Sequence, residues 1–298
     1  MKKTLLLISL ILFIIIAASA CGEGSNGESG SSDYDTSASI TVVVREDGSG
    51  TKSAFMEIIG LEGKADQANA TIQTSTEGVL AEVRGNPTAI AYESLGYVTD
   101  DVKTLKIDGV EATVDNIKTG DYRISRPLSL VYQDEILDSV VNNSFYIFLQ
   151  SSDAFEIIND NGYVTVLNAS APYMIDDTLA GTINISGSTS MQPLMSELAQ
   201  KYVSLQPNVT VNVVGSDSGQ GYSDAEDGLS EFGMISEEFK FEKAPSCVSY
   251  VVCKDGIAII VHKDNPLDSI TIEQLRSVYN VDAGANAASN WDDLINPT

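Results

Sequence analysis

The stretch REDGSGTKSAF (Arg45–Phe55) directly follows the apolar run ITVVV (Ile40–Val44). An arginine and a Gly-Ser-Gly-Thr turn therefore stand between a strand-like run and a helix-like run. Glycine lets the backbone approach a ligand closely, and the first turn of a helix has backbone N–H groups without helical partners. The stretch is typical of a loop that binds an anion at the start of a helix.

Two further strand–turn–helix junctions have the same residue types, namely Gly187-Ser188-Thr189-Ser190 and Ser216-Asp217-Ser218-Gly219. One such turn alone is typical of an ordinary helix cap. Three in one chain favour a shared site, because a tetrahedral oxyanion accepts hydrogen bonds from several directions. Arg45 is the only cation in these turns, and its planar guanidinium can hold an oxyanion with two hydrogen bonds. Arg45 can form a salt bridge with Asp47 or Glu46, and Asp47 can orient Arg45 while the other edge of the guanidinium stays free for the ligand.

Strand-like and helix-like segments alternate over the rest of the chain. This alternation predicts an α/β fold class, with mixed or parallel sheets flanked by helices. Ligands of such sheets tend to bind at the carboxyl ends of strands, where the three turns are expected to lie. The clearest expected helices cover 76–85, 139–162 and 194–207, and the expected extended segments include 102–117, 125–132, 246–253 and 255–262.

The N-terminus is typical of a secretory leader. Two lysines precede an apolar run and small residues before Cys21, which predicts a signal peptide over residues 1–20. The sequence ASAC resembles a bacterial lipobox, which implies lipidation of Cys21; an ordinary cleavage site followed by a chance cysteine is the alternative. Residues 21–39 are rich in Gly, Ser and acids, and we expect them to form a flexible linker from the lipid anchor.

The charge of the chain excludes one class of partner. The formal net charge is -25, and binding to a nucleic acid depends on basic residues that neutralise its phosphates. We therefore expect no nucleic-acid partner, and contact with the membrane only through the lipid anchor. The net charge does not decide which single ligand is bound, because a few local donors set the field inside a site.

The rare residue types argue against metal and enzyme chemistry. The chain has one histidine, His262, and no CxxC pair, so we expect no metal site and no cofactor. A Ser-His-Asp triad would require His262, for which a structural role is favoured, and the GxxxxGK[ST] motif of a P-loop is absent. Cys247 and Cys253 are expected to be buried and unpaired, with a disulfide across a turn at Ser249 as the alternative.

These segments together resemble a known family. VVVREDGSGTKSAF is similar to the anion-binding segment of the phosphate-binding proteins that serve Pst-type ABC transporters. INISGSTSMQPL resembles the first strand, phosphate loop and helix of that family, and VVGSDSGQG resembles its second loop. The resemblance extends from Ile40 to Leu294 and includes EFGMISEEF, DGIAIIVHKDNPLDSITIEQLRSVY, NWDDL, AIAYESLGYV and YRISRPLSLVY. It implies a two-lobed, periplasmic-binding-protein-like fold of type II with a hinge between the lobes.

The segments stand in an exchanged order relative to the family, in which the GSTS-like strand comes first and the REDGSGT-like loop follows the WDDL-like segment. This order predicts a circular permutation. We expect a discontinuous lobe of residues 40–125 and 251–298, a continuous lobe of residues 126–250, and a linker at 167–181 that joins the exchanged halves. Hinges are expected near 125–127 and 251–256. A fragment of a longer tandem protein, or a unit completed by swapping between chains, is the alternative.

The resemblance also implies roles for single residues. Asp47 would support Arg45, and Glu237 would accept the proton of phosphate. Because sulfate carries no proton near neutral pH, a buried carboxylate that faces the ligand favours phosphate over sulfate. The implied phosphate-binding residues are Arg45, Ser49, Gly50, Thr51, Ser190, Met191 (through its backbone N–H), Ser218, Gly219 and Glu237.

The function implied by the resemblance is not enzymatic. It is that of a lipid-anchored receptor at the outer face of the cell membrane, which binds inorganic phosphate and delivers it to the permease of an ABC transporter. Three alternatives remain open: a phosphate sensor or adhesion module without a transporter, a binder of sulfate or molybdate, and a secreted phosphatase that uses a serine such as Ser49.

Overall fold

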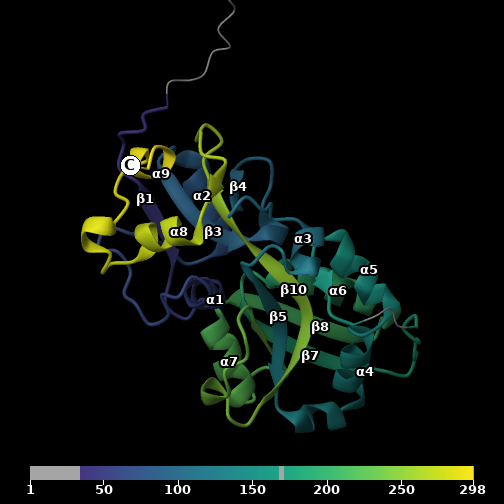
Figure 1. Cartoon of the computed structure of the whole chain (residues 1–298). Coiled ribbons are helices and arrows are strands. Elements are labelled where there is room, and N and C mark those ends of the chain that lie inside the picture. The colour runs from purple at the N-terminus through teal and green to yellow at the C-terminus, as the bar shows by residue number, and fades with distance from the viewer. Residues whose placement is uncertain (1–33, 168–170, 298) are drawn as a thin grey trace, which may run out of the picture. The chain divides into compact units, whose positions relative to one another are not determined.

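The computed structural model describes residues 34–167 and 171–297 (Figure 1). The predicted signal peptide, Cys21 and the first part of the predicted linker lie outside the described residues, as do three residues of the segment predicted to join the exchanged halves. Of the helices formed by 34–167 and 171–297, none is long and apolar enough to cross a membrane.

Strands and helices alternate along the described chain. The strands are β1 (Thr41–Arg45), β2 (Thr71–Gln73), β3 (Ala89–Ser94), β4 (Lys103–Ile107), β5 (Ser125–Tyr132), β6 (Val164–Thr165), β7 (Gly181–Ser188), β8 (Val209–Ser216), β9 (Phe232–Ile235), β10 (Val248–Val261) and β11 (Ser269–Ile270). The α-helices are α1 (Gly50–Ile58), α2 (Thr76–Gly85), α3 (Val114–Thr119), α4 (Val140–Phe148), α5 (Ser152–Asp160), α6 (Gln192–Leu205), α7 (Ser218–Glu226), α8 (Ile272–Tyr279) and α9 (Asp292–Ile295). Short 3₁₀ helices are η1 (Leu95–Tyr97), η2 (Asp134–Asp138), η3 (Phe241–Lys243) and η4 (Gly284–Asn286).

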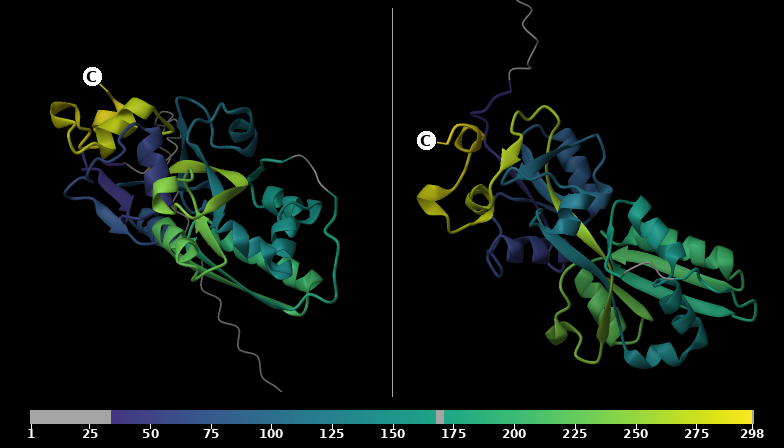
Figure 2. Two further views of the ribbon diagram at one scale, coloured as in Figure 1. Left: turned by 90° about the horizontal axis from the view of Figure 1, so that it is seen from below. Right: turned by 45° about the vertical axis from the view of Figure 1, so that its right-hand side comes forward.

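The strands form one mixed sheet whose main path runs in the order β2-β1-β3-β10-β5-β9-β7-β8. β1 is parallel to β2 and β3, and β7 is parallel to β8 and β9. β10 runs antiparallel both to β3 and to β5. In Figure 1, β10 extends from the part of the molecule with α8 and α9 to the part with α4 and α7, and the two views of Figure 2 agree. The predicted α/β fold class with mixed sheets flanked by helices is confirmed.

Two large hydrophobic cores give the protein two lobes. The first core is built around Phe55, Tyr92, Ile259 and Trp291. The second is built around Phe145, Tyr202, Phe232 and Val252. We call the elements around the first core (β1–β4, α1–α3, α8 and α9) the first lobe, and those around the second core (β7–β9 and α4–α7) the second lobe. The predicted lobe boundaries at 125–126 and 250–251 fall within β5 and β10, the strands that run between the lobes. These boundaries stay a prediction.

A buried ion pair joins β5 to β10 where these strands pass between the lobes. Arg126 donates from Nε and Nη2 to Oδ2 of Asp255 at 3.3 and 3.1 Å, and both side chains are 1% exposed. Burial raises the pKa of Asp255, although the charge of Arg126 acts in the opposite direction. Nη1 of Arg126 donates to the carbonyl oxygen of Ser236 at 3.0 Å, so the same guanidinium also holds the residue that follows β9.

Some of the elements expected from the sequence differ in the structure. Residues 102–117 were expected to be strand-rich, but only β4 is extended and α3 begins at Val114. Thr113 accepts a hydrogen bond from the backbone N–H of Asn116, and Gly120 ends α3 in the left-handed region, so local capping outweighs the β-branched residues there. The runs at 246–253 and 255–262 form a single strand, β10.

Cys247 and Cys253 are both buried and unpaired, as the sequence predicts. Burial raises the pKa of Cys247 to about 12, so its thiol stays protonated at neutral pH. The alternative of a disulfide across a turn at Ser249 is wrong, because Ser249 lies inside the extended β10.

Glycines allow α7 to pack closely on β7 and β9. A Cβ atom at Gly233 would overlap the carbonyl oxygen of Gly221, and a Cβ atom at Gly187 would overlap that of Met234. Gly187 also has a φ of +125°, which L side chains rarely adopt. Because Ser218 is the first residue of α7, this close packing determines where the N-terminus of α7 lies beside β7.

We expect Gly233→Ala to lower the free energy of unfolding by about 2–4 kcal/mol, because the overlap with backbone forces the main chain to shift. Gly85→Ala is the matched control, since Gly85 belongs to α2 and has no atom within 4 Å of the added Cβ. This control should raise stability by at most about 1 kcal/mol. Urea unfolding followed by circular dichroism measures both, and equal values for the two variants would contradict the close packing of α7.

Candidate functional site

The three glycine–serine turns of the sequence meet between the lobes. The backbone N–H of Gly219, at the start of α7, donates to the carbonyl oxygen of Gly48 in the β1–α1 loop at 3.1 Å. Thr51 in the first turn of α1 and Ser190 in the β7–α6 loop share a hydrogen bond of 2.8 Å between their hydroxyl groups. The structure thus brings together segments that are more than a hundred residues apart in the sequence.

The N-terminus of α1 carries the Gly-Ser-Gly-Thr turn. Ser49 is the N-cap and accepts a hydrogen bond from the backbone N–H of Lys52 at 3.4 Å. Gly50 is the first residue of the helix, and a Cβ atom there would overlap the hydroxyl of Ser218. Glycine at this position is what lets the N-terminus of α1 approach that of α7.

Buried hydroxyl side chains gather at this junction, and we call the following six the hydroxyl cluster: Thr51, Thr76, Ser188, Ser190, Ser218 and Ser236. Thr76, the first residue of α2, lies 3.2 Å from the hydroxyl of Ser190. Ser188 donates to Ser236 at 2.9 Å, and the hydroxyls of Ser236 and Ser218 are 3.4 Å apart. Hydroxyl groups rotate and can donate or accept, so the cluster can exchange these internal bonds for bonds to a ligand.

Arg45 lies beside the hydroxyl cluster and is 1% exposed. Its Nε and Nη2 donate to Glu46 at 3.1 and 2.9 Å, and Nη2 also donates to Thr189 in the second lobe at 3.2 Å. Its Nη1 is 3.5 Å from Oε2 of Glu93. Burial opposes the charged form of Arg45, but the two carboxylates outweigh it and raise its pKa.

Glu93 at the end of β3 is the residue that the sequence analysis missed. It is 0% exposed, and its Oε1 accepts hydrogen bonds from the backbone N–H of Ser94 at 2.8 Å and from Ser190 at 3.4 Å. Its Oε2 is buried and accepts no hydrogen bond from the described residues. The sequence did contain an indication of this residue: a glutamate follows the apolar run AIAY, at the carboxyl end of a strand, where ligands of such sheets bind.

The predicted support of Arg45 by Asp47 is wrong. The Asp47 side chain is 99% exposed and pairs with Lys52 at 2.8 Å, whose hydrogen bond lowers the pKa of Asp47. Glu46 takes this role instead, because both of its carboxylate oxygens accept hydrogen bonds from Arg45.

The predicted role of Glu237 as proton acceptor is also not supported by its contacts. Glu237 is 0% exposed, but one oxygen accepts a hydrogen bond from Ser53 and the other lies 2.6 Å from Nζ of Lys243. The backbone N–H groups of Met191 and Gly219, which were predicted to bind the anion, also donate to carbonyl oxygens of the protein. The N–H of Met191 donates to the carbonyl oxygen of Ser188 at 3.1 Å, and that of Gly219 to Gly48.

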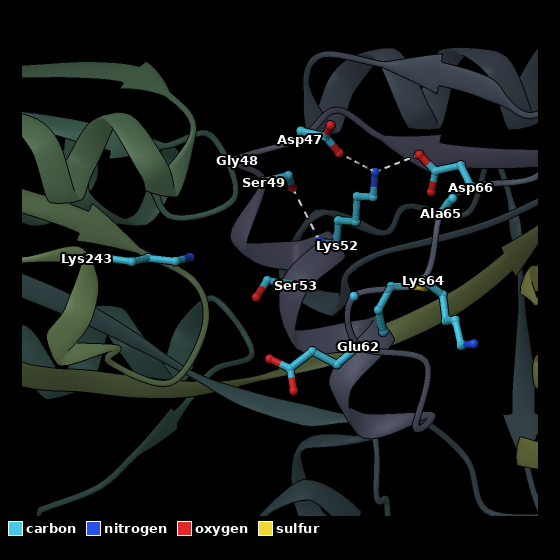
Figure 3. Close-up of a pocket in the computed structure, with 12 residues that line it drawn as sticks. Asp47, Gly48, Ser49, Lys52, Ser53, Glu62, Lys64, Ala65, Asp66 and Lys243 are labelled. Carbon is cyan, nitrogen blue, oxygen red and sulfur yellow. Dashed lines mark hydrogen bonds and ion pairs between the residues drawn. The ribbon is translucent and has the colours of Figure 1, made fainter.

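A pocket of about 560 Å³ adjoins the N-terminus of α1 (Figure 3). Ser49 and Ser53 of α1 line it, and Lys243 of the second lobe extends toward them from the opposite side. Lys52 bridges Asp47 and Asp66 on its rim, at 2.8 and 2.6 Å. The residues of the hydroxyl cluster do not line this pocket, whereas Ser49 does, so the pocket adjoins the buried site at the N-terminus of α1.

The comparisons with known proteins give the family. The model of the PBP superfamily domain, the domain of periplasmic binding proteins, matches residues 32–143 and 175–298. The chain belongs to this superfamily. It is 33% identical to the phosphate-binding protein PstS 2 of Streptococcus pneumoniae over 92% of this chain and 93% of that protein. It is 34% identical to PstS 2 of Streptococcus agalactiae, over 99% of both chains. These identities place the chain in the PstS family of the PBP superfamily.

A solved structure has the same fold. The crystal structure of a phosphate ABC transporter, phosphate-binding protein from S. pneumoniae is 33% identical, with a TM-score of 0.68 over 86% of this chain and all of that one. The two-lobed fold of the PBP superfamily, implied by the resemblance, is thereby confirmed.

The predicted circular permutation is not confirmed by these comparisons. The match to the S. agalactiae relative covers 99% of both proteins, so these two PstS-family chains share one order of segments. An exchange relative to other members of the family stays a prediction.

We expect Ser190→Ala to lower the free energy of unfolding by about 1–3 kcal/mol, because Thr51, Thr76 and Glu93 would lose a buried partner. Ser204→Ala on the exposed side of α6 is the control and should change it by less than about 0.5 kcal/mol. A double-mutant cycle with Thr51→Val tests the bond between the lobes, and strictly additive effects in urea unfolding would show that it contributes nothing.

Proposed function

We propose that this chain is an extracytoplasmic solute-binding protein, which holds inorganic phosphate between its two lobes and delivers it to an ABC transporter permease. The observation that carries the proposal is the buried Arg45, which contacts residues of both lobes beside the hydroxyl cluster. The names of the relatives and of the solved structure, which refer to phosphate binding, support the same ligand.

Phosphate would be bound mainly by hydroxyl groups and by the N-terminus of α1. Arg45 alone does not make a positive site, because Glu46 and Glu93 already lie beside it. Thr51 and Ser190 would donate to phosphate oxygens in place of their bond to each other, together with the first N–H groups of α1. Ser49, Gly50 and Ser218 would surround the anion, and Nη1 of Arg45 would complete its coordination.

Glu93 would select phosphate over sulfate. Its Oε2 is buried beside Arg45 and has no donor among the described residues. Phosphate near neutral pH carries at least one proton and can donate to this oxygen, whereas sulfate would leave a carboxylate facing an anion without a proton between them. Glu93 thus takes the role that the sequence analysis gave to Glu237.

Calorimetry on residues 22–298 tests this selection. Wild-type protein should prefer phosphate to sulfate, and Glu93→Gln should lower the ratio of the two affinities by about a hundredfold, because the repulsion of sulfate is removed. Glu111→Gln is the control, since Glu111 pairs with Lys106 at the surface of the first lobe. An unchanged ratio in Glu93→Gln would exclude Glu93 as the proton acceptor.

Arg45→Ala should abolish measurable phosphate binding, and Arg45→Lys should weaken it by about a hundredfold, because lysine keeps the charge but lacks the planar fork. Arg84→Ala, in the half-exposed last turn of α2, is the control. Circular dichroism on each variant reports whether the fold is kept. Wild-type affinity in a folded Arg45→Ala protein would rule out Arg45 as the main anchor.

We further propose that Cys21 is lipidated and tethers the protein to the outer face of the membrane. The proposal rests on the leader-like N-terminus and on the lipobox-like sequence before Cys21. Mass spectrometry of the N-terminal peptide from membranes tests it. An unmodified Cys21, or a mature chain that begins elsewhere, would contradict the anchor.

A further inference from the structure

One face of α1 points toward the second lobe along its whole length. Ser49, Ser53 and Glu57 follow one another at a spacing of four residues, so they lie on the same side of the helix. Ser49 stands at the anion site, and Ser53 and Glu57 continue this side away from it. Both of these residues contact the segment of the second lobe that follows β9.

That segment carries Glu237, Lys240 and Lys243. Ser53 donates to Glu237 across the gap between the lobes. Lys240 reaches the first lobe through Glu62 at 3.0 Å, Ser53 at 3.3 Å and Glu57 at 3.6 Å. Lys243 and Lys240 also lie 2.6 and 3.8 Å from Glu237, so the buried carboxylate is held between Ser53 and two lysines.

These contacts lie beside the site but do not belong to it. Glu237 directly follows Ser236 of the hydroxyl cluster, and Ser53 is one helical turn from Ser49. Neither residue contacts Arg45, Glu93 or Ser190 through any hydrogen bond among the described residues. Ser53, Glu62 and Lys243 line the pocket that adjoins the site (Figure 3), whereas Glu237 is fully buried.

The anion site cannot exchange its ligand in this arrangement. Thr51 and Ser190 are 1% exposed and Ser218 is 0% exposed, so the lobes must separate before a ligand enters or leaves. Separation breaks the contacts of Lys240 and Glu237 with α1 as well as those at the site. Contacts that form only when the lobes are closed favour the closed state even though they do not touch the ligand.

We propose that Glu237, Lys240 and Lys243, with Ser53, Glu57 and Glu62 opposite them, form an electrostatic latch that sets the rate at which the bound anion is released. This latch proposal rests on the proposed function, because it takes the bound anion to be phosphate. Glu237 is in this view a positioning residue of lobe closure and makes no contact with phosphate. The latch acts on release more than on capture, because its contacts form only after the lobes have come together.

The release rate tests the latch directly. Protein loaded with ³²P-phosphate is mixed with excess unlabelled phosphate, and retained label is followed over time. We expect Lys240→Met to release phosphate about fivefold faster and Glu237→Gln about tenfold faster, with a smaller effect on the association rate. Lys240→Arg, which keeps the charge, should stay close to wild type. Lys106→Met is the matched control, because Lys106 pairs with Glu111 inside the first lobe.

Small-angle X-ray scattering of the phosphate-free proteins gives a readout that does not depend on the ligand. The radius of gyration should increase in Lys240→Met and Glu237→Gln and stay constant in Lys106→Met, since the latch variants open. Wild-type release rates and an unchanged radius of gyration in both latch variants would overturn the latch.

The two proposals fail in different ways. If Arg45→Ala loses phosphate while both latch variants behave as wild type, the proposed function stands and the latch is wrong. If the wild type binds no phosphate, the proposed function is wrong, and the latch is then decided by the scattering of the phosphate-free variants alone.

Discussion

The site is built around one buried cation, Arg45, whose charge is compensated by neighbouring carboxylates. A guanidinium that is nearly removed from water is costly unless carboxylates and hydrogen-bond acceptors surround it. Arg45 meets this need with Glu46 from its own strand end, Glu93 from the end of β3 and Thr189 from the second lobe. The carboxyl ends of β1 and β3 must therefore lie together, and the β7–α6 loop must reach them. The meeting of the three glycine–serine turns depends on this arrangement.

The site contains acceptors as well as donors, and this balance distinguishes it from a simple positive pocket. Buried polar atoms without a partner among the described residues include Oε2 of Glu93, the hydroxyl of Ser94 and Oδ1 of Asp255. Of these three, Oε2 of Glu93 lies beside Arg45 in the site, whereas Asp255 pairs with Arg126 of β5. A spare acceptor beside hydroxyl donors suits a ligand that both accepts and donates hydrogen bonds.

The sequence predicted those parts of the site that depend on local patterns. A strand, a glycine–serine turn and a helix start are neighbours in the chain, so the sequence singled out Ser49, Gly50, Thr51, Ser190 and Ser218, which the structure brings together. Their role in binding stays a prediction. The support of Arg45 by Glu46 was not predicted, because the sequence does not show in which direction each residue at a strand end points. Glu93 was missed because its partners, Arg45 and Ser190, are distant in sequence. The sequence did not show the contacts of Glu237, because its partners include Ser53 of the other lobe and lysines three and six residues later.

The strand β10 contributes residues to both cores, and this couples the stability of the two lobes. Ile257 and Ile259 of β10 pack in the first core while Val252 and Cys253 pack in the second, with a bulge between Val251 and Cys253. Neither lobe can unfold without removing a strand from the sheet of the other. The protein should therefore lose its structure in one cooperative transition, and damage to either lobe lowers the thermal resistance of the whole.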